Sequence, residues 1–225
     1  LAETQHEVTN CRKLYGTTPI RHLHNLSVLD HRTRAAHCVI LDEEDVTLLA
    51  DRGVHISHCI ESNMQNAFGI APISKLLRHG VNVSIGTDCS AGNNDFDMFS
   101  EMNSVAKIYK GIGLDPTIMG AEPTLYAATS GGAAALRADD AIGSIACGKK
   151  ADCIVLDLNQ PHLIPLYNLP SQLVYAARGA DVIHSVINGR LVMENRLLKT
   201  LDEAEVISRI HEISREIQSM STSSR

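Results

Sequence analysis

Short apolar runs alternate with longer amphipathic stretches over the first 140 residues. The runs Ala35–Leu41, Val54–Cys59 and Val81–Thr87 are apolar enough to predict buried strands. The stretches around them have helical spacing and predict helices over Thr4–Tyr15, Asp42–Gly53, Pro72–Gly80, Asp95–Lys110 and Pro123–Ala138. Strands that alternate with helices of this length predict an α/β fold with a parallel sheet, either doubly wound or part of a (β/α)8 barrel.

The pattern changes after Asp140. A strand, a loop-rich stretch, a hairpin and an amphipathic helix are predicted in turn over Asp152–Leu158, Pro161–Pro170, Asp181–Glu194 and Leu201–Gln218. The Asn188-Gly189 pair closes the hairpin, because both residues tolerate the positive φ angles of a tight turn. We expect a barrel unit over residues 1–140, a β-sandwich part over 141–198, and a C-terminal helix over 199–225 whose last residues, 219–225, are frayed.

Composition and charge exclude several classes of protein. The net charge is −6, only 4% of residues are aromatic and none is Trp, which argues against nucleic-acid binding by charge or by base stacking. No run of 18 apolar residues occurs, so we expect no membrane span. The 6 Cys form no CxxC pair, which favours a cytoplasmic protein with reduced thiols. The 11 His are many for this length, and His is a common metal ligand and general acid or base.

Polar residues mark the ends of the three predicted strands. His37 belongs to the first strand, His58 to the second, and Asp88 follows the third. The carboxyl ends of parallel strands form one rim, where His and carboxylate side chains suit a divalent metal that activates water. Structural histidines and a turn-forming Asp are the alternative, and the pattern alone leaves both open. Because successive strand residues point to opposite faces, the cysteines that follow, Cys38, Cys59 and Cys89, are expected to be buried packing thiols.

Several motifs in combination resemble the amidohydrolase superfamily, and within it the methylthioadenosine/S-adenosylhomocysteine deaminases. They cover nearly the whole chain and are Leu1–Glu7 (LAETQHE), Ala36–Val39 (AHCV), Ser57–Met64 (SHCIESNM), Gly69–Pro72 (GIAP), Gly86–Asp88 (GTD) with Asn93-Asn94, Gly143–Asp157, and Ala176–Arg190. The resemblance implies the second half of a (β/α)8 TIM barrel, from the end of strand 5 to strand 8, with the C-terminal part of a small β-sandwich domain.

The resemblance also implies a chemistry and a set of roles. The family binds one divalent metal, zinc in most members and iron in some, and hydrolyses C–N bonds of heterocycles. Asp88 matches the metal-ligating Asp, which also takes a proton from the attacking water. Glu3 matches the acid that protonates the ring nitrogen, and His37 matches the residue that orients the water and contacts substrate. His58 lies in the strand 7 motif near the mouth of the barrel and is a second candidate for substrate binding. Its role is expected to be a supporting one, behind the residues that contact the metal.

Departures from the family pattern limit this expectation. The other metal ligands of the family lie upstream of Leu1, so Asp88 is the one metal ligand that the motifs place in this sequence, and the chain alone is expected to be inactive. Ile60 replaces a usual Pro, and Gly92 stands where nucleoside deaminases often have Ser.

Three functions remain open at this stage. The first is deamination of an adenine-type nucleoside, such as 5′-methylthioadenosine or S-adenosylhomocysteine, by the intact protein. The second is guanine or cytosine deamination, or triazine hydrolysis. The third is a non-catalytic half-barrel that binds or assembles. We expect a small-molecule heterocyclic substrate, no nucleic-acid or membrane partner, and leave a homo-oligomer open.

Overall fold

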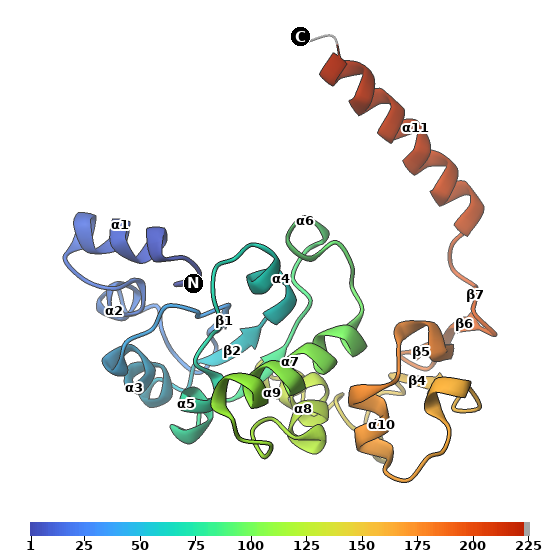
Figure 1. The fold of residues 1–225 in the computed structure, drawn as a ribbon, viewed down its shortest axis with the longest axis horizontal. Coiled ribbons are helices and arrows are strands. Elements are labelled where there is room, and N and C mark those ends of the chain that lie inside the picture. The colour runs from blue at the N-terminus through green and yellow to red at the C-terminus, as the bar shows by residue number, and fades with distance from the viewer. Residues whose placement is uncertain (223–225) are drawn as a thin grey trace. The chain divides into compact units, whose positions relative to one another are not determined.

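The computed structural model describes residues 1–222, which divide into two units (Figure 1). The first unit comprises Leu1–Lys149 and Leu158–Asp181, and the second comprises Lys150–Asp157 and the chain from Val182 on. This division differs from the one expected at residue 140, because the proline-rich stretch after Leu158 returns to the first unit, where α10 contacts α7 and α8.

A parallel sheet organises the first unit. Its described strands are β1 (Arg34–Ala36), β2 (His55–His58) and β3 (Val83–Ile85), paired in the order β1-β2-β3. The parallel sheet is therefore as predicted, but the strands are shorter. The first ends at Ala36 and not at Leu41, since His37 and Cys38 both have positive φ angles, which an extended strand does not allow.

The helices of the first unit lie before, between and after these strands along the chain. They are α1 (Gln5–Tyr15), α2 (Pro19–Asn25), α3 (Glu43–Asp51), α4 (Ile60–Gln65), α5 (Ile73–Arg78), α6 (Ser90–Asn93), α7 (Met98–Gly113), α8 (Ala121–Ala128), α9 (Ser130–Ala135) and α10 (Leu169–Tyr175). The helix predicted over Pro123–Ala138 is interrupted at Thr129, so α8 and α9 are separate. The pattern did not predict α2, α4, α6 or α10, because helices of four to seven residues are too short to show a period.

Capping residues explain where two of the predicted helices begin. The Thr4 side chain accepts a hydrogen bond from the Glu7 backbone N–H and caps α1. Asp42 caps α3 in a reciprocal capping box with Asp45, and three acids occupy the first turn, where the helix dipole favours negative charge. Helices α5, α7, α8 and α9 contact β3, and α9 also contacts β2. The core is fully buried at Ile20, Val46, Leu49, Ile56, Ile73, Leu76 and Val105.

The second unit is an antiparallel sheet followed by a helix. Its described strands are β4 (Cys153–Leu156), β5 (Val182–Ile187), β6 (Arg190–Glu194) and β7 (Leu197–Leu198), and the helix is α11 (Glu203–Thr222). The hairpin between β5 and β6 is as predicted, with Asn188 and Gly189 both at positive φ. Within residues 1–222, none of the helices has the length and apolar character that a bilayer span needs.

The expected frayed tail is wrong for part of its length. Residues 219–222 continue α11, whereas residues 223–225 lie outside the described residues.

Candidate functional site

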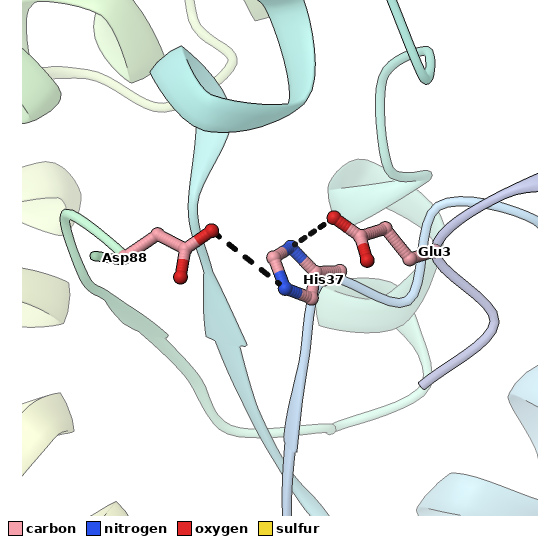
Figure 2. Close-up of side chains that lie close together, drawn as sticks. All are labelled: Glu3, His37 and Asp88. Atoms are coloured by element: carbon pink, nitrogen blue, oxygen red, sulfur yellow. Dashed lines mark ion pairs between the residues drawn. The ribbon is translucent and has the colours of Figure 1, made fainter. Parts of the chain in front are cut away.

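Three of the residues singled out in the sequence converge in the first unit. Glu3 Oε1 lies 3.5 Å from His37 Nδ1, and Asp88 Oδ2 lies 3.9 Å from His37 Nε2. Figure 2 shows the imidazole ring between the two carboxylates, with one on the side of each ring nitrogen. All three side chains are partly exposed, so the group is open to a ligand.

Glu3 is held beside His37 by backbone pairing. The Cys38 N–H donates to the Leu1 carbonyl at 3.1 Å, and the Ile40 N–H donates to the Ala2 carbonyl at 2.9 Å. The Glu7 carboxylate then accepts the N–H groups of Ala2 and Glu3, at 2.9 and 2.8 Å. The residues before α1 therefore run along the segment after β1, and Glu7 fixes the backbone from which Glu3 projects.

His37 occupies a strained position at the end of β1. Its φ angle is 69°, in the left-handed region that residues with a Cβ rarely adopt. Its backbone N–H donates to the Ser57 carbonyl of β2 at 3.0 Å, which continues the sheet pairing by one residue. Such strain is concentrated at functional sites, where the surrounding structure over-determines an unusual side-chain direction.

Asp88 also has a positive φ angle, and its carboxylate accepts two short hydrogen bonds. Its φ angle is 64°, Ser62 Oγ donates to Oδ2 at 2.7 Å, and the Cys89 N–H donates to Oδ1 at 2.8 Å. The Ser62 hydroxyl, the Cys89 N–H and the nearby His37 ring lower the pKa of Asp88 below its ordinary value of 3.8. This carboxylate is therefore ionised and oriented in the folded chain.

Gly92 leaves the space in which Ser62 reaches Asp88. A Cβ placed on Gly92 would lie 2.9 Å from Ser62 Oγ, closer than real Cβ contacts, and 3.0 Å from Asp88 Oδ2, closer than most of them. The Ser62 hydroxyl thus occupies the volume that a side chain at position 92 would need. This gives a physical reason for glycine at the position where the sequence departs from the nucleoside deaminases.

A buried carboxyl group supports the Asp88 loop from behind. The Asn93 amide donates to the Thr87 carbonyl at 2.9 Å and to Glu101 Oε1 at 3.0 Å. Glu101 is completely buried, and this burial, together with the charge of Glu61, raises its pKa to about 8. Glu101 therefore holds its proton at neutral pH, and it links α7 to the loop that carries Asp88.

His58 lies outside the group of three. Its side chain is completely buried, and Nε2 lies 3.0 Å from the Tyr109 hydroxyl, which donates to the Ala71 carbonyl at 2.8 Å. Burial lowers the pKa of His58 to about 3, so the ring is neutral. Complete burial leaves His58 no exposed surface for a substrate, which contradicts the substrate-binding role expected from the motif. A supporting role behind the site stays a prediction.

The cysteines follow the prediction at two of three positions. Cys38 and Cys59 are buried, and burial raises the pKa of each thiol to about 12. Cys89 is exposed, which contradicts the expectation of a packing thiol. The strict alternation of an extended strand does not reach this residue, because β3 ends at Ile85 and Asp88 has a positive φ angle.

The structure places Glu3 and His37 close enough to Asp88 to be further candidate ligands for a metal ion. Ligand atoms of Glu3, His37 and Asp88 all lie within 4.8 Å of one another, the group that the described residues offer for a metal ion. One imidazole nitrogen and two carboxylates form a donor set that suits Zn²⁺ or Fe²⁺. The site fits a divalent cation, and carboxylate and imidazole groups are also the side chains that most often transfer protons in catalysis.

Sequence reasoning gave no role to Glu7, Ser62 or Asn63. Glu7 and Ser62 are described above, and the Asn63 amide lies 3.0 Å from His37 Nδ1. The signal was present, since Glu7 belongs to the first quoted motif and Ser62-Asn63 to the third. The sequence could not show which residue each of these side chains hydrogen-bonds.

Comparison with known proteins gives a consistent group of relatives. A model described as the amidohydrolase family matches residues 1–192. A 5-methylthioadenosine/S-adenosylhomocysteine deaminase of Syntrophobacter fumaroxidans is 50% identical over 97% of this chain and 50% of its own length. The chain spans about half the length of the curated relatives it matches.

Two solved structures extend this comparison. An adenosine deaminase from Xanthomonas campestris, solved with bound zinc, has a TM-score of 0.93 and 40% identity over 96% of this chain and 49% of its own. An atrazine chlorohydrolase from Arthrobacter aurescens, complexed with zinc, has a TM-score of 0.83 and 26% identity over 91% of this chain and 46% of its own.

Proposed function

This chain belongs to the amidohydrolase family, and we propose that the protein carrying it is a metal-dependent hydrolase that deaminates an adenine-type nucleoside. Suitable substrates are 5′-methylthioadenosine and S-adenosylhomocysteine, the compounds in the names of its curated relatives. The observation that carries the proposal is the convergence of Glu3, His37 and Asp88 within 4.8 Å on one open face of the first unit.

The three residues take complementary roles in this proposal. Asp88, which its lowered pKa keeps ionised, would hold the divalent cation, and it would also accept a proton from the attacking water. Glu3 delivers a proton to the ring nitrogen next to the amino-bearing carbon, and His37 orients the water between the two carboxylates. When bound, the cation supplies Lewis-acid polarisation and lowers the pKa of water. Proton transfer to the amino group then lets ammonia leave, and the products are the 6-oxo nucleoside and ammonia.

The fold supports a finer assignment, which is also a proposal. The sheet order β1-β2-β3 follows the chain order, as neighbouring strands do in a (β/α)8 barrel. We assign β1, β2 and β3 to barrel strands 6, 7 and 8, and the Glu3 motif to the end of strand 5. The antiparallel sheet of the second unit then corresponds to the C-terminal part of the β-sandwich domain.

A substrate panel and a metal analysis test the function together. The protein in its complete form, loaded with zinc, is incubated with 5′-methylthioadenosine, S-adenosylhomocysteine, guanine, cytosine and atrazine. Ammonia release and chloride release are followed for each. We expect ammonia from the two nucleosides and about one divalent metal per chain by elemental analysis.

Other outcomes decide between the alternatives. Release of ammonia from guanine or cytosine alone, or of chloride from atrazine, would replace the nucleoside proposal with the second candidate. That candidate draws on the likeness to the atrazine chlorohydrolase. Absence of bound metal and of any product from the complete protein would favour a non-catalytic binding module.

A further inference from the structure

Ser62 connects the Asp88 carboxylate to a separate helix of the first unit. It lies on α4, it is buried, and its hydroxyl donates to Asp88 Oδ2 at 2.7 Å across 26 positions of sequence. We propose that Ser62 and Gly92 form a pair that positions Asp88 for a divalent cation, in which Ser62 supplies the hydrogen bond and Gly92 supplies the space for it. The inference rests on the proposed function, in which Asp88 holds the cation.

The first argument concerns the rotational freedom of the Asp88 carboxylate. The torsion that turns a carboxylate about its Cβ–Cγ bond has broad minima, so hydrogen bonds are needed to fix the two oxygens. The Cys89 N–H donates to Oδ1 at 2.8 Å, but Cys89 is the next residue and belongs to the same loop as Asp88. The Ser62 hydroxyl comes from α4, and it therefore fixes Oδ2 relative to a separate helix.

The second argument comes from the oxygen that Ser62 contacts. Oδ2 is the Asp88 oxygen that pairs with His37, at 3.9 Å from Nε2, so it belongs to the group of three side chains. A carboxylate oxygen carries two lone pairs, and Oδ2 can accept the Ser62 hydrogen bond and still bind a cation. Hydrogen bonds to metal-binding carboxylates orient them, and loss of such a partner typically lowers metal affinity by about 10–100-fold.

The third argument is the fixed spacing between α4 and α6. The Asn66 amide nitrogen donates to the Ser62 carbonyl at 2.9 Å and to the Gly92 carbonyl at 3.1 Å, so one side chain ties the two backbones together. A Cβ on Gly92 would lie 2.9 Å from Ser62 Oγ. Because Asn66 opposes a separation of the two helices, a side chain at position 92 would displace the Ser62 hydroxyl from Asp88.

The same geometry predicts that the hydroxyl can be supplied from either position. The Cβ built on Gly92 would also lie 3.0 Å from Asp88 Oδ2. A hydroxyl one bond beyond this Cβ is within reach of the same carboxylate, provided that the Ser62 hydroxyl is removed. Substitutions at positions 62 and 92 should therefore not be additive, as is usual for residues in contact that share a partner.

The zinc affinity of the complete protein tests this pair. The metal-free protein and its variants are titrated with Zn²⁺ against a chelator of known zinc affinity, so the measurement needs no turnover. Ser62→Ala should lower the affinity by roughly 10–100-fold. Gly92→Ser should also lower it, because the new side chain displaces the Ser62 hydroxyl. In the double variant Ser62→Ala/Gly92→Ser the hydroxyl comes from the other helix, and zinc should bind more tightly than to either single variant.

Two controls separate positioning from packing. The double variant Ser62→Ala/Gly92→Ala fills the same space without a hydroxyl, and it should bind zinc no more tightly than Ser62→Ala. Ser104 donates its hydroxyl to the Glu61 carboxylate at 2.6 Å, a similar pair outside the group of three. Ser104→Ala should therefore leave the zinc affinity unchanged. Thermal unfolding of each metal-free variant shows whether it is folded.

The outcomes also keep the two proposals apart. An unchanged zinc affinity in Ser62→Ala would overturn this inference, and so would equal recovery by Gly92→Ala and Gly92→Ser in the Ser62→Ala background. Should the Gly92 variants not fold, the comparison of Ser62→Ala with Ser104→Ala still decides. Zinc binding that depends on Ser62, without ammonia release, would contradict the proposed function alone. Absence of zinc binding by the unsubstituted protein would contradict both.

Discussion

The two units differ in how far their apolar side chains are buried. In the first unit, Leu49, Ile56 and Leu76 are completely buried. In the second unit, described side chains over residues 150–157 and 182–220 include none that is buried. There, Ile187 is 57% exposed and Ile210 is 60% exposed.

This difference shows where the chain can support a precise site. Residues at a catalytic centre need supporting partners whose own positions are fixed by packing. The first unit provides them, since Ser62, Asn63 and Glu101 are all buried and support site residues that are only partly exposed. The second unit has the amphipathic pattern of a folded module, but its apolar side chains are not buried. Four predictions test this contrast.

The largest effect is expected at the site. In the complete zinc-loaded protein, Glu3→Gln should keep the metal and lower turnover by roughly 10²–10⁴-fold, the range for loss of a general acid or base. Asp88→Asn should lose both metal and activity, because it removes the ionised ligand. Glu194→Gln, an exposed carboxylate of the second unit, should leave both unchanged. Steady-state kinetics and elemental analysis measure these outcomes, and equal metal loss in the Glu3 and Asp88 variants would contradict their separate roles.

The next effect concerns stability. Ile56→Ala removes a completely buried side chain and should lower the free energy of unfolding by about 2–5 kcal/mol. Ile187→Ala, at 57% exposure, should change it by no more than about 0.5 kcal/mol. Denaturant titrations of the two variants compare the units directly. A similar loss in both would show that the apolar residues of the second unit are covered in solution.

A pH-dependent effect should follow from Glu101. Its pKa is raised to about 8 in the folded chain, from an ordinary value of 4.5. Below pH 4.5 both folded and unfolded states hold this proton, so its contribution to stability is fully present. Between 4.5 and about 8 only the folded state keeps the proton, so the free energy of unfolding falls as pH rises.

Substitution should remove that pH dependence. Glu101→Gln keeps the hydrogen-bonding shape without a titrating group, and its stability should decline less between pH 5 and pH 9 than that of the unsubstituted chain. Glu216→Gln on the exposed α11 serves as the control and should leave the profile unchanged. A profile that stays the same in Glu101→Gln would mean that another group carries the dependence.

The smallest effect is expected on α11. Ile210→Ser on its exposed apolar face should change the free energy of unfolding by no more than about 0.5 kcal/mol if this face stays in water. Sedimentation velocity of the same variant reports the assembly state. A change in sedimentation, or a larger loss of stability, would show that another surface covers α11 in solution and would remove the contrast between the units.

Local patterns in the sequence were sufficient for much of the fold. The apolar runs around Ile56 and Val83 predicted the parallel strands, the acids after Asp42 predicted the start of α3, and Asn188-Gly189 predicted the hairpin. Each of these features depends on residues close together in the chain, where periodicity, capping and turn preferences act. The motifs also named Glu3, His37 and Asp88, which the structure brings together.

The partners of these residues were decided only by the tertiary structure. Ser62 reaches Asp88 and Asn63 reaches His37 across 26 positions, and Glu101 reaches Asn93 from another helix. His37 and Asp88 also take positive φ angles, so strand alternation could not give their directions or the exposure of Cys89. Sequence periodicity reports which face of an element is apolar, whereas a hydrogen bond between distant residues depends on how the elements pack. For this reason the sequence by itself determined the longer elements and the reactive groups, whereas packing determined the short helices, the exact ends of the strands and the atoms that hold the reactive groups.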